Sequence, residues 1–361
     1  MQKEKIAFNH QFLTLPTELD GISELIELAL DLRWSWNRRT DRLWKWLDAE
    51  LWETMKNPWN ILKTVSHAKL KQLLADPEFL ALVKNLAQAN REDDQQLGWF
   101  DKNYANSSLK TVAYFSMEYM LTEALPIYSG GLGNVAGDQL KAASDLNVPI
   151  IGIGLLYQQG YFRQFIDKQG AQQALYPYND PGQLPITPLR RANGEWLRLK
   201  LDFPGWSLWI RAWQVEVGRT TLLLLDSNDS VNPPFHRGIT SELYGGGPEL
   251  RLKQELLLGI GGWKLLQELA IEPEVCHLNE GHAAFAILER AKSLMIKEQI
   301  PFETALAITR EGNLFTTHTA VPAGFDRFSP DLMERYLARY ANQQLQISFK
   351  ELMALGRCNA R

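Results

Sequence analysis

A succession of strand, glycine-rich loop, helix and strand constrains the fold of this chain most. The apolar run from Thr111 to Ser116 predicts a buried strand, and the run from Val148 to Tyr157 predicts a second. Between them lie a glycine-rich loop, Tyr128 to Asp138, and an amphipathic helix over about Asn134 to Leu146. Strands joined through a helix form right-handed parallel crossovers, so we expect an α/β fold around a parallel sheet.

Sequence periodicity assigns the remaining segments. Helical spacing of apolar residues from Ile22 to about Gln96 predicts a helical N-terminal extension over residues 1–105, ahead of one α/β lobe over residues 106–361. Apolar and polar residues alternate over about 185–226, which predicts an antiparallel excursion from the parallel sheet with one face exposed to solvent. Asn228 to Gly247 reads as a long surface loop. Further strands are expected over Val275–Asn279 and Leu314–His318, and helices over Pro248–Ala270, Ala283–Lys297 and Pro330–Tyr340.

Tryptophans are concentrated in the helical stretch from Ile22 to about Gln96, which holds six of the 12. Their rings offer surface on which sugars stack, but tryptophans interleaved with leucines at helical spacing are more typical of a core. We therefore expect them to pack within or against the extension. They are Trp34, Trp36, Trp44, Trp46, Trp52 and Trp59.

Composition excludes several classes of protein. Hydrophobic residues make up 45% and charged residues 22%, which argues against intrinsic disorder. A net charge of -4 gives no general attraction to nucleic acid or anionic membranes, and no apolar run is long enough to span a bilayer. Cys276 and Cys358 match no metal or redox spacing, and the N-terminus lacks the apolar core of a secretory signal. We expect a cytoplasmic protein.

Polar residues follow the predicted strands at the edge where open parallel sheets bind ligands. An unpaired polar group costs roughly 1 to 3 kcal/mol when buried, so these groups meet either a ligand or one another. We favour a ligand site, and a self-satisfied hydrogen-bond network is the alternative. The three segments are Ser116–Tyr119, which contains Glu118, His277–His282, which contains Asn279 and Glu280, and Thr316–Thr319, which contains His318.

The glycine-rich loop precedes a helix, where backbone N–H groups attract anions. It contains G-x-G-x-x-A from Gly131 to Ala136, but a nicotinamide site also needs a carboxylate at the end of the next strand, and none is there. We favour contact with a phosphate or phosphosugar over a plain turn. His277, Glu280 and His282 leave a strand-to-helix turn in divergent directions, so we expect no metal site. Serine-hydrolase elbows and Walker A lysines are absent from the sequence.

Taken together, several segments resemble the N-terminal half of an α-glucan (glycogen, starch or maltodextrin) phosphorylase. The helical extension, with Leu32-Arg-Trp-Ser-Trp-Asn, resembles the one found on the short bacterial and archaeal branch of that family. The resemblance is specific because long motifs follow one another in the right order. They are Phe115-Ser-Met-Glu-Tyr, Tyr128-Ser-Gly-Gly-Leu-Gly, Arg251-Leu-Lys-Gln-Glu, His277-Leu-Asn-Glu-Gly-His-Ala-Ala-Phe and Phe315-Thr-Thr-His-Thr-Ala-Val-Pro-Ala-Gly-Phe-Asp.

The resemblance implies a two-lobed glycosyltransferase of the GT-B type that uses phosphate to release glucose 1-phosphate from an α-1,4-glucan, with retention. It implies pyridoxal phosphate as the cofactor, whose phosphate group assists the reaction. His318 resembles the catalytic-site residue that contacts the transferred glucose. The substrate-binding positions implied are Gly130, Gly131, Leu132 and Gly133 in the loop, with Asn279, Glu280, His282 and Thr319 at the strand ends. Mammalian relatives place an aspartate at the position of Glu280.

In the family, the lysine that binds pyridoxal phosphate and the basic residues that hold substrate phosphate belong to the C-terminal lobe. No segment here resembles that lobe. We therefore expect a truncated or split phosphorylase that is inactive alone, whose partners are an α-1,4-glucan, phosphate and the missing lobe. An uncovered lobe face would favour self-association. A nucleotide-sugar-dependent starch or glycogen synthase and a glucan-binding or regulatory lobe without catalysis remain alternatives; residues 277–282 and 316–326 favour the phosphorylase.

Overall fold

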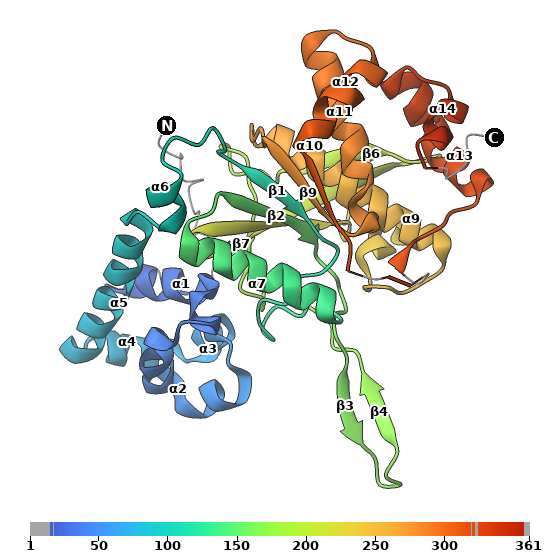
Figure 1. The fold of residues 1–361 in the computed structure, drawn as a ribbon. Coiled ribbons are helices and arrows are strands. Elements are labelled where there is room, and N and C mark those ends of the chain that lie inside the picture. Colours follow the sequence, from blue (N-terminus) through green and yellow to red (C-terminus); the bar gives the residue numbers. More distant parts are fainter. Residues whose placement is uncertain (1–14, 17, 319, 322–323, 357–361) are drawn as a thin grey trace.

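The computed structural model describes residues 15–16, 18–318, 320–321 and 324–356. It shows a mixed α/β architecture in which helices surround a mostly parallel central sheet (Figure 1). This confirms the fold class expected from the alternation of strands and helices. Thr319 and Cys358 lie outside the described residues.

The central sheet has the strand order β10-β9-β1-β2-β8-β7-β5, with β6 paired to β7. Its parallel part consists of β10 (Asn313–Thr316), β9 (Val275–Asn279), β1 (Val112–Phe115), β2 (Ile150–Leu155) and β8 (Thr220–Asp226). Its antiparallel part consists of β7 (Ser207–Val217), β6 (Arg198–Asp202) and the two-residue β5 (Thr187–Pro188). The carboxyl ends of β10, β9 and β1 therefore lie side by side.

Two glycines in β2 make room for a buried tyrosine under the sheet. A Cβ atom on Gly154 would lie 2.9 Å from Cε2 of Tyr119, and one on Gly152 would lie 3.4 Å from the Tyr119 hydroxyl and 3.1 Å from Leu140. The Tyr119 hydroxyl donates to the backbone oxygen of Tyr114 at 2.7 Å, which satisfies it in the core. The chain after β1 is thereby tied to the middle of the sheet.

The last strand of the expected antiparallel excursion differs from the prediction. Strand β8 pairs in parallel with β2 and antiparallel with β7, so it joins the two parts of the sheet. Six of its seven residues are buried, whereas β6 alternates between buried and exposed residues beyond its first. A strand covered on both faces loses the period of two, which is why its sequence did not reveal its position. The loop that follows also folds, into α8 (Pro234–Arg237) and a 3-10 turn.

Helices cover both faces of the sheet. Helix α7 (Gly131–Leu146) packs on one face, where Leu140 meets β2. On the other face, Gly262 at the start of α10 (Gly262–Glu268) lets the helix approach: a Cβ there would lie 2.6 Å from Ile153. The further helices after β8 are α9 (Pro248–Leu256), a π-helical segment (Leu257–Gly261), α11 (Phe285–Glu298), α12 (Phe302–Thr309), α13 (Pro330–Tyr340), which runs into a second π-helical segment (Ala341–Leu345), and α14 (Phe349–Ala354).

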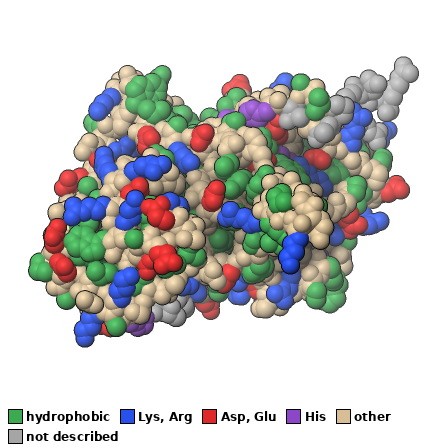
Figure 2. All heavy atoms as spheres, turned by 90° about the horizontal axis from the view of Figure 1, so that it is seen from below, with side chains coloured by type: hydrophobic (Ala, Val, Ile, Leu, Met, Phe, Trp, Pro, Cys, Tyr) green, Lys and Arg blue, Asp and Glu red, His purple; other side chains and the backbone are tan. Residues whose placement is uncertain are grey.

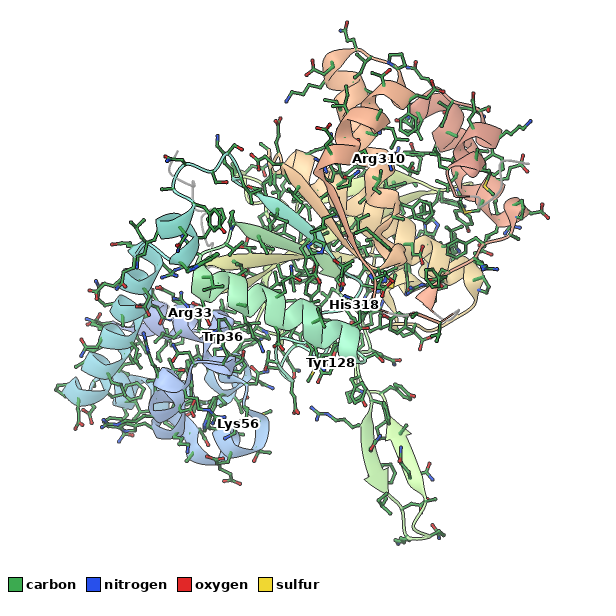
Figure 3. The ribbon with its side chains drawn as sticks, viewed as in Figure 1. Arg33, Trp36, Lys56, Tyr128, Arg310 and His318 are labelled. Atoms are coloured by element: carbon green, nitrogen blue, oxygen red, sulfur yellow. The ribbon has the colours of Figure 1, made fainter. Side chains whose placement is uncertain are left out.

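The helical extension packs on the sheet domain and shares one apolar core with it. Its α-helices are α1 (Ile22–Leu30), α2 (Asp41–Met55), α3 (Pro58–Thr64), α4 (His67–Leu74), α5 (Pro77–Gln95) and α6 (Trp99–Asn103). Four of the six tryptophans are buried and the other two are partly buried against the core, which confirms the expected packing role. Trp36 donates to Asp145 of α7 at 3.1 Å, and Gly218 donates to Asp31 at 3.1 Å, so the extension is joined to the sheet domain (Figure 3).

A two-stranded hairpin that the sequence did not predict projects from the body (Figure 1). It consists of β3 (Arg163–Ile166) and β4 (Gln172–Leu175), and all eight strand residues are exposed. None of the helices in the described part of the chain is long and apolar enough to cross a membrane.

Candidate active site

A chain of hydrogen bonds joins the carboxyl ends of three neighbouring strands. His318 Nε2 lies 2.8 Å from Asn279 Oδ1, and Asn279 Nδ2 donates to Ser116 Oγ at 3.1 Å. The Ser116 hydroxyl in turn donates to the backbone oxygen of Glu118 at 2.9 Å. Asn279 and Ser116 are fully buried, whereas His318 is exposed at the end of the network (Figure 3). The structure thus brings together the polar strand ends that the sequence placed at one edge.

Glu280 is held in a backbone conformation that side chains rarely adopt. Its φ is 69° and its ψ is 172°, a region occupied almost only by glycine and costing roughly 1–3 kcal/mol. Its carboxylate accepts a hydrogen bond from the His318 backbone N–H and another from Thr317 Oγ1 at 3.2 Å. Its own N–H donates to the Thr316 oxygen at 2.9 Å. Glu280 therefore holds the backbone of Thr317 and His318 in place.

The other two histidines of the strand ends serve as internal supports. His282 is buried, and its Nε2 accepts from the Met117 backbone N–H at 3.0 Å. Burial, assisted by the charge of Arg251, lowers the pKa of His282 to about 3, so the ring is neutral. His277 lies 2.7 Å from Thr316 Oγ1, and burial followed by the proximity of His318 lowers its pKa. Each ring thus has a nitrogen engaged with a neighbouring protein group.

The glycine loop is tied to the end of β1 by the buried carboxylate of Glu118. Its Oε2 accepts from the backbone N–H groups of Ser129 at 2.6 Å and Gly130 at 3.0 Å. A Cβ on Gly133 would lie 2.8 Å from the same oxygen, so glycine is required for this approach. The loop cannot use the amides of Ser129 and Gly130 for a ligand while Glu118 holds them.

Two amides remain at the start of α7. The Gly133 N–H donates to Gly130 O at 3.1 Å, and no described group accepts from the N–H of Gly131 or Leu132. A Cβ on Gly130 or Gly131 would meet no atom within 4 Å, so the space in front of the helix is open. The positive end of a 16-residue helix thus faces that space with two amides.

Sequence reasoning missed a second layer around the loop. The Tyr244 hydroxyl donates to Glu118 Oε1 at 2.8 Å, and the Arg251 guanidinium lies 5.1 Å from the Tyr244 ring centroid. Arg251 also pairs with Asp326 at 2.8 Å. Arg251 and Asp326 each belong to a motif of the phosphorylase resemblance, whereas Tyr244 lies in an irregular segment without a periodic signal. Only spatial proximity identifies Tyr244, and only the structure pairs Arg251 with Asp326.

Glu255 lies beneath this layer and gives the protein a pH-dependent stability. Burial raises its pKa to about 9 from an ordinary 4.5, outweighing the charge of Arg251, whose Nε lies 3.1 Å away. The native state therefore keeps a proton that the unfolded state releases, and this stabilisation is complete below pH 4.5 and lost as pH rises towards 9. His282 acts in the opposite sense: its stabilisation is complete above pH 6.5 and lost as pH falls towards 3.

Glu255→Gln should remove the alkaline loss of stability. We expect the Tm of the parent to fall between pH 6.5 and 9 by at least about 2 °C more than that of the variant, because a neutral amide has no proton to release. Thermal unfolding followed by circular dichroism across this range measures the difference. Glu303→Gln, on the exposed first turn of α12, should follow the parent. Parallel Tm curves for the parent and Glu255→Gln would contradict the assignment.

The described residues contain no group of three or more His, Cys, Asp and Glu side chains that would hold a metal. Burial raises the pKa of the Cys276 thiol to about 12, so it is no nucleophile. Positive and negative side chains are intermingled over the face shown in Figure 2. That face offers no extended patch of one sign to attract a polyanion.

Comparison with known proteins places this site in a family context. Residues 246–355 match the family model for carbohydrate phosphorylase, and residues 15–125 match a family described as a protein of unknown function, DUF3417. The chain is 43% identical to the maltodextrin phosphorylase of Thermococcus litoralis and 42% identical to the glycogen phosphorylase of Mycobacterium tuberculosis, over 90% and 88% of its length. It is 33% identical over 92% of its length to the glycogen phosphorylase of Aquifex aeolicus.

The chain is therefore related to the maltodextrin and glycogen phosphorylases, which confirms the resemblance predicted from its motifs. It covers 39% of the Thermococcus protein, 38% of the Mycobacterium protein and 47% of the Aquifex protein. The glycine loop and the β3–β4 hairpin lie outside both matched family models.

Proposed function

We propose that this chain supplies part of the active site of an α-1,4-glucan phosphorylase of the GT-B type. The reaction transfers the terminal glucose of the glucan to phosphate and yields glucose 1-phosphate with retention. The observation that carries the proposal is the hydrogen-bonded set of strand ends beside the open start of α7, in a chain related to phosphorylases. Hydrogen-bond donors held in fixed positions stabilise charge that develops during glycosyl transfer.

The proposed contacts follow from the groups that remain available. The amides of Gly131 and Leu132 would face the phosphate of glucose 1-phosphate, and the exposed ring and backbone of His318 would contact the glucose. Asn279 and Glu280 would act as positioning residues, since the first holds the His318 ring and the second its backbone. His282 would support the loop after β1 from beneath. Thr319 is retained as a substrate contact on the resemblance alone.

Pyridoxal phosphate, when bound, would supply a phosphate group that assists glycosyl transfer. The amides of Gly131 and Leu132 fit a phosphate group at the helix start. The described side chains that hydrogen bonds and ring contacts place around the glycine loop include no amine that would anchor an aldehyde; they are Glu118, Tyr244, Arg251, Asn279 and His318. We propose that a second lobe carries the cofactor lysine.

The free edge of the sheet supports the need for a second lobe. Within the described part of the chain β10 pairs with β9 alone, and Leu314 and Phe315 are 50% and 52% exposed. The backbone oxygen of Thr316 accepts from Glu280, directly after β9. Because successive residues of a strand direct their backbone groups to opposite sides, the N–H and C=O of Phe315 point away from β9, towards the free edge. Unpaired, apolar edges are normally covered in native proteins. The covering segment is proposed to belong to the remaining length of the phosphorylase.

A phosphorolysis assay tests the proposal. Maltoheptaose, phosphate and pyridoxal phosphate are incubated with this chain alone and with the complementary remainder of the Thermococcus litoralis relative. We expect glucose 1-phosphate only from the mixture, and His318→Ala in the mixture should lower kcat at least about a hundredfold because the sugar contact is lost. Release by this chain alone would contradict the half-site.

Two further arms separate the alternatives. Glucan elongation from a nucleotide sugar, without phosphorolysis, would support a synthase. Glucan binding with no reaction in any mixture would leave a glucan-binding lobe. Hydrogen exchange with glucose 1-phosphate provides a readout that needs no turnover: the amides of Gly131 and Leu132 should become protected.

A further inference from the structure

A continuous row of four aromatic rings leads from the glycine loop to the projecting hairpin. The centroids of Tyr128 and Tyr161 lie 5.8 Å apart, those of Tyr161 and Phe162 lie 5.0 Å apart, and those of Phe162 and Tyr176 lie 6.1 Å apart. We call these four residues the aromatic row. They come from three separate stretches of the chain, the start of the glycine loop and the two sides of the hairpin.

Exposure is lowest at the loop end of the aromatic row and highest at its far end, with Phe162 partly buried in between. Tyr128 is only 9% exposed, whereas Tyr161 is 42% and Tyr176 is 58% exposed. These exposed rings make no part of the core, unlike the six tryptophans between Ile22 and Gln96. A tyrosine joins an apolar ring to a polar hydroxyl, so an exposed row of such rings suits a ligand with both C–H faces and hydroxyl edges.

The hairpin holds the row in place although its strands contact little else. Asn179, at the base of the returning strand, donates its N–H to Gln158 O at 2.7 Å and its side-chain amide to Tyr157 O at 2.9 Å. Gly160 packs directly on the Pro126 carbonyl, where a Cβ atom would overlap that carbonyl. At the tip, Asp167 accepts from the backbone N–H groups of Gln169 and Ala171. An isolated hairpin is marginal in water, so these anchors matter.

The aromatic row begins beside the glycine loop, so a ligand that extends from the loop would contact it. Tyr128 immediately precedes Ser129 and Gly130, whose amides Glu118 holds, and Figure 3 shows it between the start of α7 and the hairpin. A polymer whose terminal sugar lies at the glycine loop would pass along this surface. The charges beside it are balanced, because Arg163 pairs with Glu123 at 3.6 Å, which suits a neutral ligand.

We propose that the aromatic row binds the α-glucan chain beyond its reacting sugar, through packing of pyranose C–H faces on the rings. The inference rests on the proposed function for the identity of the polymer. A neutral oligosaccharide gains affinity from each ring it covers, so a row of rings favours long chains over short ones. The hairpin is then a specificity element for glucan length.

The test measures binding of maltoheptaose and of maltose to the full 361-residue chain by isothermal titration calorimetry. In the double variant Tyr161→Ala/Tyr176→Ala, the Kd for maltoheptaose should rise at least about tenfold, because two exposed stacking surfaces are lost. The Kd for maltose should change less than twofold. The corresponding phenylalanine double variant keeps the rings and should bind nearly as well as the parent.

Tyr104→Ala is the matched control, since Tyr104 is 51% exposed and stacks on Phe100. Tyr104 directly follows α6, which lies across the molecule from the hairpin (Figure 1). The control variant should leave maltoheptaose affinity unchanged. Equal affinity of the parent and the alanine double variant overturns the proposal, as does a parent that does not bind maltoheptaose. A change of oligomeric mass in light scattering, with glucan affinity retained, overturns it in favour of a contact between copies.

Failure of the row and failure of the proposed function give different results. Suppose that glucose 1-phosphate protects the Gly131 and Leu132 amides, but that the alanine double variant binds maltoheptaose as tightly as the parent. Only the row proposal then fails. If the row binds maltoheptaose but no phosphorolysis occurs with the complementary lobe, the row proposal stands and the phosphorylase assignment fails.

Discussion

Glu118→Ala should lower the free energy of unfolding by about 3–5 kcal/mol, because it leaves several buried donors without an acceptor. The carboxylate accepts from the backbone N–H groups of Ser129 and Gly130 and from the hydroxyl of Tyr244. Each unsatisfied group costs about 1–3 kcal/mol, and a cavity adds to the loss. Urea unfolding followed by circular dichroism measures the change at equilibrium.

Glu118→Gln is the matched variant. Its amide oxygen can accept from the two backbone groups while its NH2 donates to the Tyr244 hydroxyl, so we expect a loss of only about 1–2 kcal/mol. Tyr244→Phe, which removes one bond and leaves the loop anchored, should cost about 1 kcal/mol. Equal losses for the alanine and glutamine variants would mean that the hydrogen bonds of Glu118 contribute little.

Glu280→Ala should lower the free energy of unfolding by about 2–3 kcal/mol, because alanine keeps the backbone strain and loses the compensating contacts. At a φ of 69° and a ψ of 172°, a side chain is disfavoured, and the native state persists because the carboxylate accepts from the His318 N–H and the Thr317 hydroxyl. Urea unfolding again provides the measurement.

Glu280→Gly distinguishes strain from hydrogen bonding. Glycine adopts this conformation without steric cost, so we expect a smaller loss than for alanine, by about 1 kcal/mol, although the same contacts disappear. In both variants the His318 amide should exchange its hydrogen faster than in the parent. A glycine variant less stable than the alanine variant would show that the backbone of Glu280 is not strained.

The regular elements of the fold were predictable where one periodicity dominates. Strand β9 and helix α13 were expected at their observed bounds, and β1 and β2 within a few residues, because a short apolar run and an amphipathic helix differ clearly in sequence. The role of β8 was not predictable, since burial on both faces removes the alternation that reveals partners. The exposed β3–β4 hairpin has no buried face and therefore no alternation of apolar and polar residues to detect.

The candidate site was predictable as a location but not as a set of partners. Parallel strands must bring their polar ends together, and the His318–Asn279–Ser116 network meets that expectation. The sequence does not reveal that the Glu118 carboxylate accepts from two amides of the loop. Nor does it reveal that Tyr244, 126 positions further along the chain, donates to the same carboxylate. Long-range contacts depend on how the elements pack, and local sequence periodicity does not determine that packing.

The close contact between Gly160 and the Pro126 carbonyl makes the hairpin an exchangeable module with a fixed direction. Because all strand residues of the hairpin are exposed, the segment between Tyr161 and Tyr178 can be lengthened, shortened or replaced without repacking the core. A larger residue at Gly160 would instead clash with that carbonyl and displace the base of the arm. Engineers who exchange this arm between relatives should therefore keep the glycine at its base and vary only what it carries.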